Sequence, residues 1–506
     1  MYKLHLILKY LRKRRIAWVS LVAVMLCTMM VLVVISIMGG WVRMFENSFH
    51  GLTGDIVIDG DSLVGFGNYE KMIERIEKLD CVVAAVPQIK TFGLINIDNR
   101  KTVGVQVVAF PIDKVGKVNK FPQSLYLGHT QYVEQANDKT APLTADQRRA
   151  LLKKAEEAAA NPSFNKPLTA EQYRREMNWA PGRGKDPANW PGMIAGAGVV
   201  EIRKDAEGNV TGRGDHLYRL PVKLTVMPIS PDFMAVNMQD KVERNYWLVD
   251  DSRTQVWQYD SNCVYVPFDV LQENLDMGPR KVTDRVTGEE VTLPSRCTDI
   301  QVGVKEGFKD RAGLKDAKAR IHAVVEAVLA ENPDPYDLER PEVKTWRESQ
   351  AMWLDAVEKE KLLVVFLFSI ISVVAIFLIF CIFYMVVAEK TRDIGIIKSV
   401  GASAPGVAGI FLGYGLAIGL VGGGLGLLLS WLLVKNINEI HTWLGKQLGI
   451  QVWNPEVYLF DKIPNTMDTF EVSMIVSVAV VASVLGALVP AIRAARMNPV
   501  EAVRWE

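Results

Sequence analysis

Long uncharged apolar stretches recur along this chain, separated by stretches in which polar and apolar residues mix. Each apolar stretch exceeds the roughly 20 residues that a helix needs to cross the hydrocarbon core of a bilayer. None contains Asp, Glu, Lys, Arg or His, which are costly inside a membrane. The pattern therefore predicts a membrane protein with four transmembrane α-helices, at residues 16–40, 362–388, 406–434 and 472–492.

The charges that flank these stretches predict the orientation of the chain. Lys and Arg collect on the cytoplasmic side of a membrane, and six of them precede the first stretch. Residues 1–15 are therefore expected in the cytoplasm, and four crossings return residues 493–506 to the same side. The first stretch is longer than the apolar core of a cleaved signal peptide, so we interpret it as an uncleaved anchor.

This orientation places residues 41–361 outside the cytoplasm, as a large extracytoplasmic α+β domain between the first and second transmembrane helices. A helical stalk is expected near 341–361, and residues 435–471 make only a short extracytoplasmic loop. Alternating patterns predict strands, and helical patterns predict helices. The strands are expected at 55–59, 104–110, 198–203, 218–227 and 263–267, and the helices at 69–80 and 309–331.

Residues near 130–190 differ in composition and are expected to form a polar surface insertion. Thr144 and Thr169 each stand three residues before a Gln, which is the spacing of a helix-starting capping box. Two small polar helices are therefore expected within the insertion.

The segment between the second and third transmembrane helices, residues 389–405, is short and carries both charged and apolar side chains. Ile394 and Ile397 share one helical face, while Lys390, Asp393 and Lys398 supply polar contacts. One interpretation is an amphipathic helix at the cytoplasmic surface, available to a cytoplasmic protein. The other is an ordinary loop that follows the positive-inside rule.

The third transmembrane helix is rich in glycine. The pairs Gly409/Gly413, Gly415/Gly419 and Gly422/Gly426 have the spacing that lets two helix backbones approach closely. Such a helix could slide or tilt against its neighbours, or it could simply be tightly packed. Sequence alone leaves both open.

Several kinds of chemistry lack their usual motif in this chain. The phosphate-binding loop G-x-x-x-x-G-K-[ST] is absent, so the chain is not expected to hydrolyse ATP itself. There is no H-E-x-x-H or G-x-S-x-G motif, and the six histidines have no ligand spacing. A net charge of +1 gives no argument for binding nucleic acid. We therefore expect a non-catalytic subunit that binds no cofactor or metal.

Cysteine usage leaves one question open. Cys81, Cys263 and Cys297 are expected outside the cytoplasm, where disulfides persist. A bridge between Cys263 and Cys297 is conceivable, but spacing alone cannot establish its geometry.

Two segments carry a resemblance to a known family. Residues 389–403, EKTRDIGIIKSVGAS, and 490–506, PAIRAARMNPVEAVRWE, resemble the coupling segment and the C-terminus of FtsX/MacB-type ABC transporter permeases. Residues 35–41, ISIMGGW, and 259–267, YDSNCVYVP, are most similar to the lipoprotein-releasing LolC/LolE permeases. The insertion near 130–190 has no counterpart in this resemblance.

The resemblance implies a location in the bacterial inner membrane and a set of partners. A second, identical or sister permease subunit is expected, together with a cytoplasmic ABC ATPase of the LolD or MacB kind. That ATPase would bind the ATP and Mg. The residues expected to couple to it are Glu389, Lys390, Arg392, Asp393, Ile394, Gly395, Ile397, Lys398 and Gly401.

The LolC/LolE likeness further implies a lipoprotein substrate, extracted from the outer leaflet of the membrane and passed to a periplasmic carrier. An apolar cleft for its acyl chains is expected from Ile35, Met38, Trp41, Met44, Phe45, Val364, Phe368 and Ile371. The carrier contact would fall on Ser230, Pro231, Asp232, Phe233 and Met234.

Two other functions are open. One is mechanotransmission of the MacB or FtsX kind, which exports a periplasmic substrate or activates a cell-wall hydrolase. The other is a membrane-anchored binding or sensor protein without transport.

Overall fold

The structure is a computed structural model. The residues it describes are 15–97, 101–137, 143–164, 189–200, 203–204, 210–211, 221–229, 241–254, 256–283, 290–333, 340–448, 463 and 465–498. These residues divide into two compact units, with one boundary at Phe45 and the other at Met352. We call residues Phe45–Met352 the sheet unit and the described residues outside that range the helical unit, and we describe each by itself.

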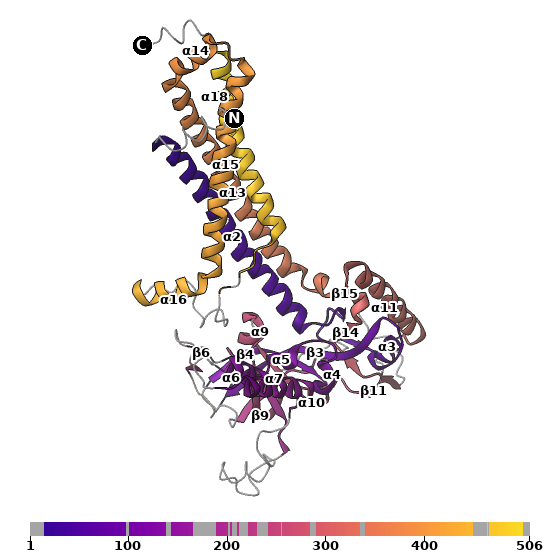
Figure 1. The fold of residues 1–506 in the computed structure, drawn as a ribbon. Coiled ribbons are helices and arrows are strands. Elements are labelled where there is room, and N and C mark those ends of the chain that lie inside the picture. Colours follow the sequence, from indigo (N-terminus) through magenta and orange to yellow (C-terminus); the bar gives the residue numbers. More distant parts are fainter. Residues whose placement is uncertain are drawn as a thin grey trace. The chain divides into compact units, whose positions relative to one another are not determined.

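The helical unit consists mainly of four long helices (Figure 1). They are α2 (Arg15–Leu52), α13 (Ala351–Glu389), α15 (Ala404–Lys435) and α18 (Thr469–Arg496), of which α2 and α13 also reach into the sheet unit. All four are long and apolar enough to cross a membrane, judged by length and composition. The short helix α14 (Thr391–Ser399) joins α13 to α15, and α16 (Ile437–Leu448) follows α15 at the opposite end of the helical unit (Figure 1).

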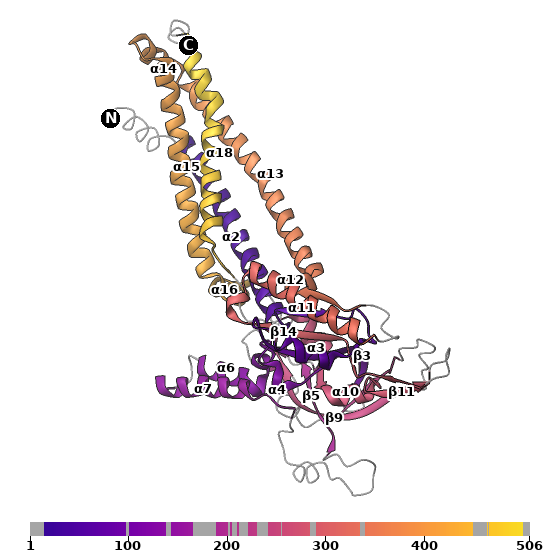
Figure 2. The ribbon, with the colours of Figure 1, turned by 90° about the vertical axis from the view of Figure 1, so that its right-hand side faces the viewer.

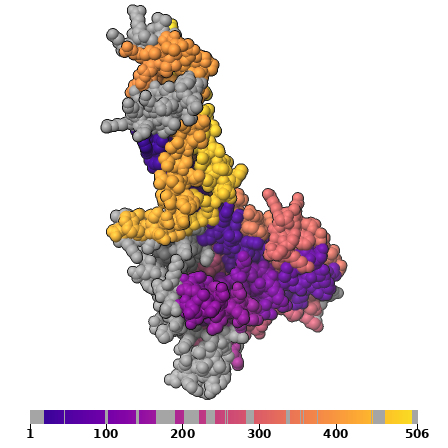
Figure 3. Space-filling model, in the orientation of Figure 1, coloured from indigo at the N-terminus to yellow at the C-terminus, as the bar shows by residue number. Residues whose placement is uncertain are grey.

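Glycines let α15 pack closely against two other helices. A Cβ atom on Gly415 would lie 2.7 Å from the Cβ of Ala487 on α18, and one on Gly426 would lie 2.7 Å from the carbonyl oxygen of Met25 on α2. By contrast, a Cβ atom on Gly424 would meet no atom of another described helix or strand within 4 Å. Two of the three predicted pairs, Gly415/Gly419 and Gly422/Gly426, therefore lie at close helix–helix contacts. Figure 3 shows α15 and α18 side by side.

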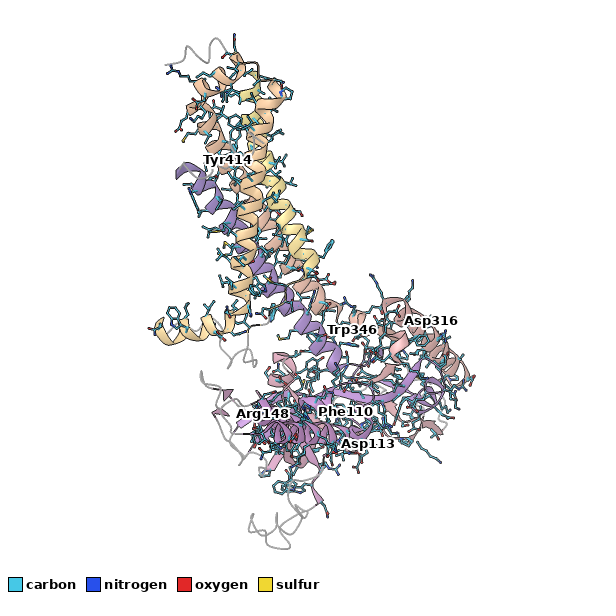
Figure 4. The ribbon with its side chains drawn as sticks, viewed as in Figure 1. Phe110, Asp113, Arg148, Asp316, Trp346 and Tyr414 are labelled. Carbon is cyan, nitrogen blue, oxygen red and sulfur yellow. The ribbon has the colours of Figure 1, made fainter. Side chains whose placement is uncertain are left out.

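Polar contacts join these helices near the α16 end. Arg43 on α2 donates a 2.6 Å hydrogen bond to Asp468, the N-cap of α18. Lys361 on α13 donates a 2.9 Å bond to Glu471 on α18. Farther along, the ring of Tyr414 on α15 packs edge-on against Phe383 on α13, with ring centres 5.3 Å apart (Figure 4).

The sheet unit is built around a nine-stranded mixed sheet in the order β15-β1-β14-β3-β4-β10-β5-β9-β8. A further pairing of β8 with β3 closes six of these strands into a ring. The strands are β1 (Ile56–Asp59), β3 (Val82–Ile97), β4 (Lys101–Phe110), β5 (Gly192–Gly196), β8 (Pro221–Val226), β9 (Val242–Ser252), β10 (Cys263–Pro267), β14 (Asp299–Val304) and β15 (Glu342–Thr345). Shorter strands are β2 (Phe66–Gly67), β6 (Arg203–Lys204), β7 (Val210–Thr211), β11 (Arg280–Thr283), β12 (Glu290–Leu293) and β13 (Arg296–Cys297).

Helices flank this sheet. The buried side chains of α3 (Tyr69–Ile76) and α11 (Arg311–Glu331) join one apolar core with strand residues such as Ile56 and Val302, and Arg75 pairs with Glu331 between the two helices. The other helices are α4 (Ile112–Val115), α5 (Phe121–Ser124), η1 (Tyr126–Thr130), α6 (Gln131–Asn137), α7 (Ala145–Ala160), α9 (Trp257–Asn262), α10 (Phe268–Asn274), η5 (Glu306–Phe308) and α12 (Trp346–Ser349). The mixture is the α+β architecture that the sequence predicts.

Hydrogen bonds connect the start of the predicted insertion to strand β9. Helices α6 and α7 lie side by side (Figure 2). The capping box that begins α7 is confirmed, with Thr144 accepting from the backbone of Gln147, whereas Thr169 lies outside the described residues. The preceding turn, η1, is held by the buried carboxylate of Asp250, which accepts from the backbone N–H groups of Leu127 at 2.9 Å and Gly128 at 3.1 Å.

Two sequence predictions for this unit are wrong in detail. The stalk near 341–361 is not helical at its start, because residues 342–345 form β15, which pairs with β1 and buries Val343. The predicted strand at 198–203 is also wrong in its first half: residues 198–200 form turns after β5 has ended at Gly196. Residues 201–202 lie outside the described residues, and Arg203 begins β6. In the turns, the backbone N–H groups of Gly198 and Val199 donate to the carbonyl oxygen of Asp260.

The cysteine question has a definite answer in the structure. Cys263 and Cys297 are both buried and unbridged, and the Cys263 thiol lies 3.5 Å from the side-chain oxygen of Gln106.

Candidate functional site

The candidate site has two parts, a surface helix and an apolar cavity, both in the helical unit. The surface helix is α14. It begins directly after α13 with Lys390 as its N-cap and ends just before Gly401, whose φ of 103° favours glycine. The positive φ turns the chain into α15, whose first turn is capped by the Ser403 side chain. The chain therefore reverses direction at α14 within a few residues.

One face of α14 is turned into the bundle. Ile394 is 4% exposed and packs in a small apolar cluster with Val387, Val407 and Ala494. Gly395 and Thr391 are buried beside it. These residues fix α14 to the ends of the neighbouring helices.

Lys398 extends this attachment to α18. Its ammonium group donates to the carbonyl oxygen of Ala495 at 2.8 Å and to that of Met497 at 2.6 Å. The last carbonyl groups of a helix lack partners within the helix, and a cation is favourable there. Lys398 therefore caps the end of α18 and does not point freely to a partner.

The opposite face of α14 is free for contact. Arg392 is exposed on it, and two apolar side chains, Ile396 at 47% and Val400 at 84%, are exposed beside it. Lys390 pairs with Asp393 on the same helix, and Ile397 is half-buried. Of the predicted coupling residues, Arg392 is thus on the free face and Ile394, Gly395 and Lys398 are on the attached face. The prediction missed Ile396 and Val400, although their spacing of four residues signals a shared face.

The second part of the site is an apolar cavity of about 300 Å³ between α2, α13 and α18. We call it the apolar cavity. Its walls are mostly aliphatic, with Ile35 from α2, Phe368 from α13 and Val478 from α18 among them. A few hydroxyl groups also line it, including that of Thr28, which is buried without a hydrogen-bond partner among the described residues. Such a lining suits a flexible apolar ligand.

The structure brings together only part of the cleft predicted from sequence. Ile35 and Phe368 line the apolar cavity. The remaining described members lie on the same two helices but are not among its lining residues: Met38, Trp41, Met44 and Val364 are half-buried, and Ile371 is 42% exposed. The side chain of Phe45 and the proposed carrier contact, residues 230–234, lie outside the described residues.

Sequence reasoning also missed the contribution of α18 to the cavity. One wall comes from Met474, Ile475, Val478, Ala479, Ala482 and Ser483. The small residues Ser483, Gly486, Ala487 and Pro490 follow one another at intervals of one to three positions, which is a signal for close helix packing. At Gly486 the helix comes so close to α13 that a Cβ atom would lie 2.9 Å from Cγ2 of Ile379.

Comparisons with known proteins find a family match within the helical unit. Residues 365–499, which include most of α13 and all of α14, α15 and α18, match the family model described as FtsX-like permease C-terminal. The chain is 32% identical over 164 residues to the lipoprotein-releasing system transmembrane protein LolC of Neisseria meningitidis serogroup B, a match that covers 32% of this chain and 40% of LolC. The match thus spans about two fifths of that relative.

More distant relatives are of the MacB kind. The macrolide export ATP-binding/permease protein MacB of Hahella chejuensis is 31% identical over 160 residues, covering 30% of this chain and 21% of MacB. The crystal structure of the periplasmic region of MacB from Actinobacillus actinomycetemcomitans aligns with 61% of this chain, and the alignment covers 97% of the MacB chain. With a TM-score of 0.25 and 9% identity it does not bear on the fold.

The predicted family resemblance is confirmed in the C-terminal part of the chain: residues 365–499 are an FtsX-like permease domain.

Proposed function

We propose that this chain is the permease subunit of an ABC transporter in the bacterial inner membrane, with the sheet unit in the periplasm. In this proposal a separate ATPase hydrolyses ATP, and the permease uses that energy to extract lipoproteins from the outer leaflet and release them. The FtsX-like permease domain and the likeness to a lipoprotein-releasing LolC protein support it.

The observation that carries the proposal is that α13 joins α14 to the wall of the apolar cavity. The helix contributes Phe368 to the cavity and leads without a break to Glu389, just before α14. Lys398 links α14 to the end of α18, which forms another wall. A displacement of α14 would therefore move two of the three cavity walls.

The energetics explain why such a device needs ATP. Each buried CH₂ group of a lipid anchor contributes about 0.8 kcal/mol to membrane binding, so a protein with several acyl chains does not leave the bilayer spontaneously. An apolar cavity within the helical unit gives an acyl chain an apolar environment during extraction. Movement of the walls would then close the cavity and expel the chain.

A second candidate function is MacB-like export of a periplasmic substrate that carries no acyl chain. The similarity to the macrolide export protein favours it. The two candidates differ in whether the apolar cavity receives an acyl chain.

Photo-crosslinking can separate these candidates. A crosslinker at Val478, which lines the cavity, should capture an acylated lipoprotein and should not capture the same protein lacking its acyl chains. The matched control is Val481 on the same helix, because it is 56% exposed against 55% for Val478 but does not line the cavity. Equal capture from both positions, or capture independent of acylation, would contradict lipoprotein extraction.

A further inference from the structure

On the other side of the close contact between Gly486 and α13, a second hollow opens near α14. It has a volume of about 650 Å³ and lies between the last turns of α13 and those of α18. We call it the arginine groove. Its apolar wall includes Val387 on α13 and Val489 and Ile492 on α18. Val489 is 57% exposed and Ile492 is 41% exposed, so this wall continues the apolar outer surface that a membrane-crossing helix presents to lipid.

The polar side of the arginine groove is positively charged. Arg493 donates a hydrogen bond to the hydroxyl of Tyr384, and its guanidinium carbon lies 4.5 Å from the centre of that ring. Arg496, one turn further along α18, makes no hydrogen bond or ion pair with any residue in the described part of the chain. The described residues that line the groove include no Asp or Glu. Two positive charges therefore face the groove with no carboxylate among its described lining residues.

We propose that the arginine groove binds an anionic phospholipid, with the phosphate on Arg493 and Arg496 and the acyl chains along Val387, Val489 and Ile492. The planar guanidinium group pairs well with phosphate oxygens, and basic pockets between membrane helices hold anionic head groups. The apolar wall selects a lipid over free phosphate, because it offers contact for chains that an inorganic ion lacks. The inference is independent of which substrate the transporter carries.

The bound lipid would affect α14 through its neighbours. The groove touches Thr391, the first residue of α14, and Lys398 of α14 holds the carbonyl groups of Ala495 and Met497 on either side of Arg496. An occupied groove would thus fix the ends of α13 and α18 against α14. We expect anionic lipid to raise the temperature at which the helical unit unfolds.

The test measures lipid binding to the purified full chain in detergent by native mass spectrometry, with phosphatidylglycerol and phosphatidylcholine as probes. The variant Arg493→Gln/Arg496→Gln should bind phosphatidylglycerol at least tenfold more weakly, with no change for phosphatidylcholine. The matched control Arg392→Gln/Lys435→Gln removes the same charge from positions outside the groove and should stay within twofold of the wild type. Arg496→Gln alone is a second variant that breaks no contact within the described structure.

Three results would overturn the proposal. The first is equal binding of the two lipids by the wild type, and the second is unchanged phosphatidylglycerol binding in both arginine variants. The third is displacement of phosphatidylglycerol by millimolar inorganic phosphate, which would make the groove a site for the free ion. Loss of a partner ATPase from Arg496→Gln, with lipid binding unchanged, would likewise assign the groove to that protein.

Discussion

Gly486 on α18 and Ile379 on α13 stand in such close contact that the two helices leave no room for a side chain at position 486. A Cβ atom there would lie 2.9 Å from Cγ2 of Ile379 and 3.1 Å from the carbonyl oxygen of Ile376. Residues of both helices before this contact line the apolar cavity, and residues after it line the arginine groove. The contact therefore separates two hollows formed by the same pair of helices.

We predict that Gly486→Ala destabilises the helical unit, because the added methyl group would lie 2.9 Å from Cγ2 of Ile379 and only 3.1 Å from a backbone oxygen. Overpacking of this kind costs about 1–3 kcal/mol. The measurement is the midpoint of thermal unfolding in detergent. Gly424→Ala on α15 is the matched control, since no other element in the described part of the chain lies within 4 Å of its added carbon, and its midpoint should not fall. Equal loss in both variants would mean that the contact at Gly486 has no special role.

The two faces of α14 should respond differently to substitution. Arg392→Glu/Val400→Glu alters only exposed side chains, so the fold should persist while co-purification of a partner ATPase from membranes falls at least tenfold. Lys398→Met removes two hydrogen bonds to the end of α18 and should lower the unfolding midpoint. A hydrogen bond that involves a charged group contributes about 1.5–3 kcal/mol to the free energy of unfolding. Retention of the ATPase by the first variant would contradict a docking role for this face.

Asp250 should make the stability of the sheet unit depend on pH. Burial, and then the charge of Asp251, raises the pKa of Asp250 from 3.8 to about 7. The folded state thus binds a proton more tightly than the unfolded state, so the stabilising effect is complete below about pH 4 and is lost as pH rises to about 7. Over this range the free energy of unfolding falls by an amount on the order of 4 kcal/mol. Each unit by which the pKa of Asp250 differs between the folded and unfolded states corresponds to about 1.4 kcal/mol.

The fluorescence of Trp247, fully buried in the same strand, can follow this unfolding between pH 4 and 8. Asp250→Asn should flatten the pH dependence, whereas Asp113→Asn at an exposed position should leave it as in the wild type. A steep fall in stability with pH that survives in Asp250→Asn would show that another group is responsible.

The capping box of α7 should support the start of the insertion. Thr144→Ala removes the side chain that accepts from the backbone of Gln147, which costs about 1 kcal/mol at a helix N-terminus. Hydrogen exchange of α7 should become faster, while exchange in the strands of the sheet stays unchanged. Unchanged exchange in α7 would indicate that packing against α6 alone maintains the helix.

Local patterns predicted the parts of this protein that depend on local sequence. The apolar runs predicted the four long helices. The charged segment after Ala388 left a short helix and an ordinary loop open, and the structure has the helix α14 there. The helices at α3 and α11 and strands such as β4 and β10 also follow their local patterns. The prediction of a helix was wrong for Glu342–Thr345, because this segment pairs with strand β1, which lies almost 300 residues earlier in the chain. No local pattern indicates such a partner.

The candidate site was less predictable for the same reason. The charge of Lys398 suggested a contact for a partner, but the side chain instead bonds to carbonyl groups about 100 residues later in the chain. The apolar cavity was expected between two helices, and its third wall comes from α18. Three-dimensional packing decides which apolar residues face a cavity and which face lipid, and single-helix patterns do not distinguish them.

The proposed release of acylated proteins from a membrane can be tested with purified components. Its most direct test is reconstitution of the chain with its ATPase in liposomes that carry a lipoprotein, followed by separation of membrane-bound and released protein. From this proposal we expect ATP-dependent release that is lost in Arg392→Glu/Val400→Glu and reduced when Val478→Trp fills the apolar cavity. ATP hydrolysis without release of the lipoprotein, or release that does not depend on the acyl chains, would contradict it.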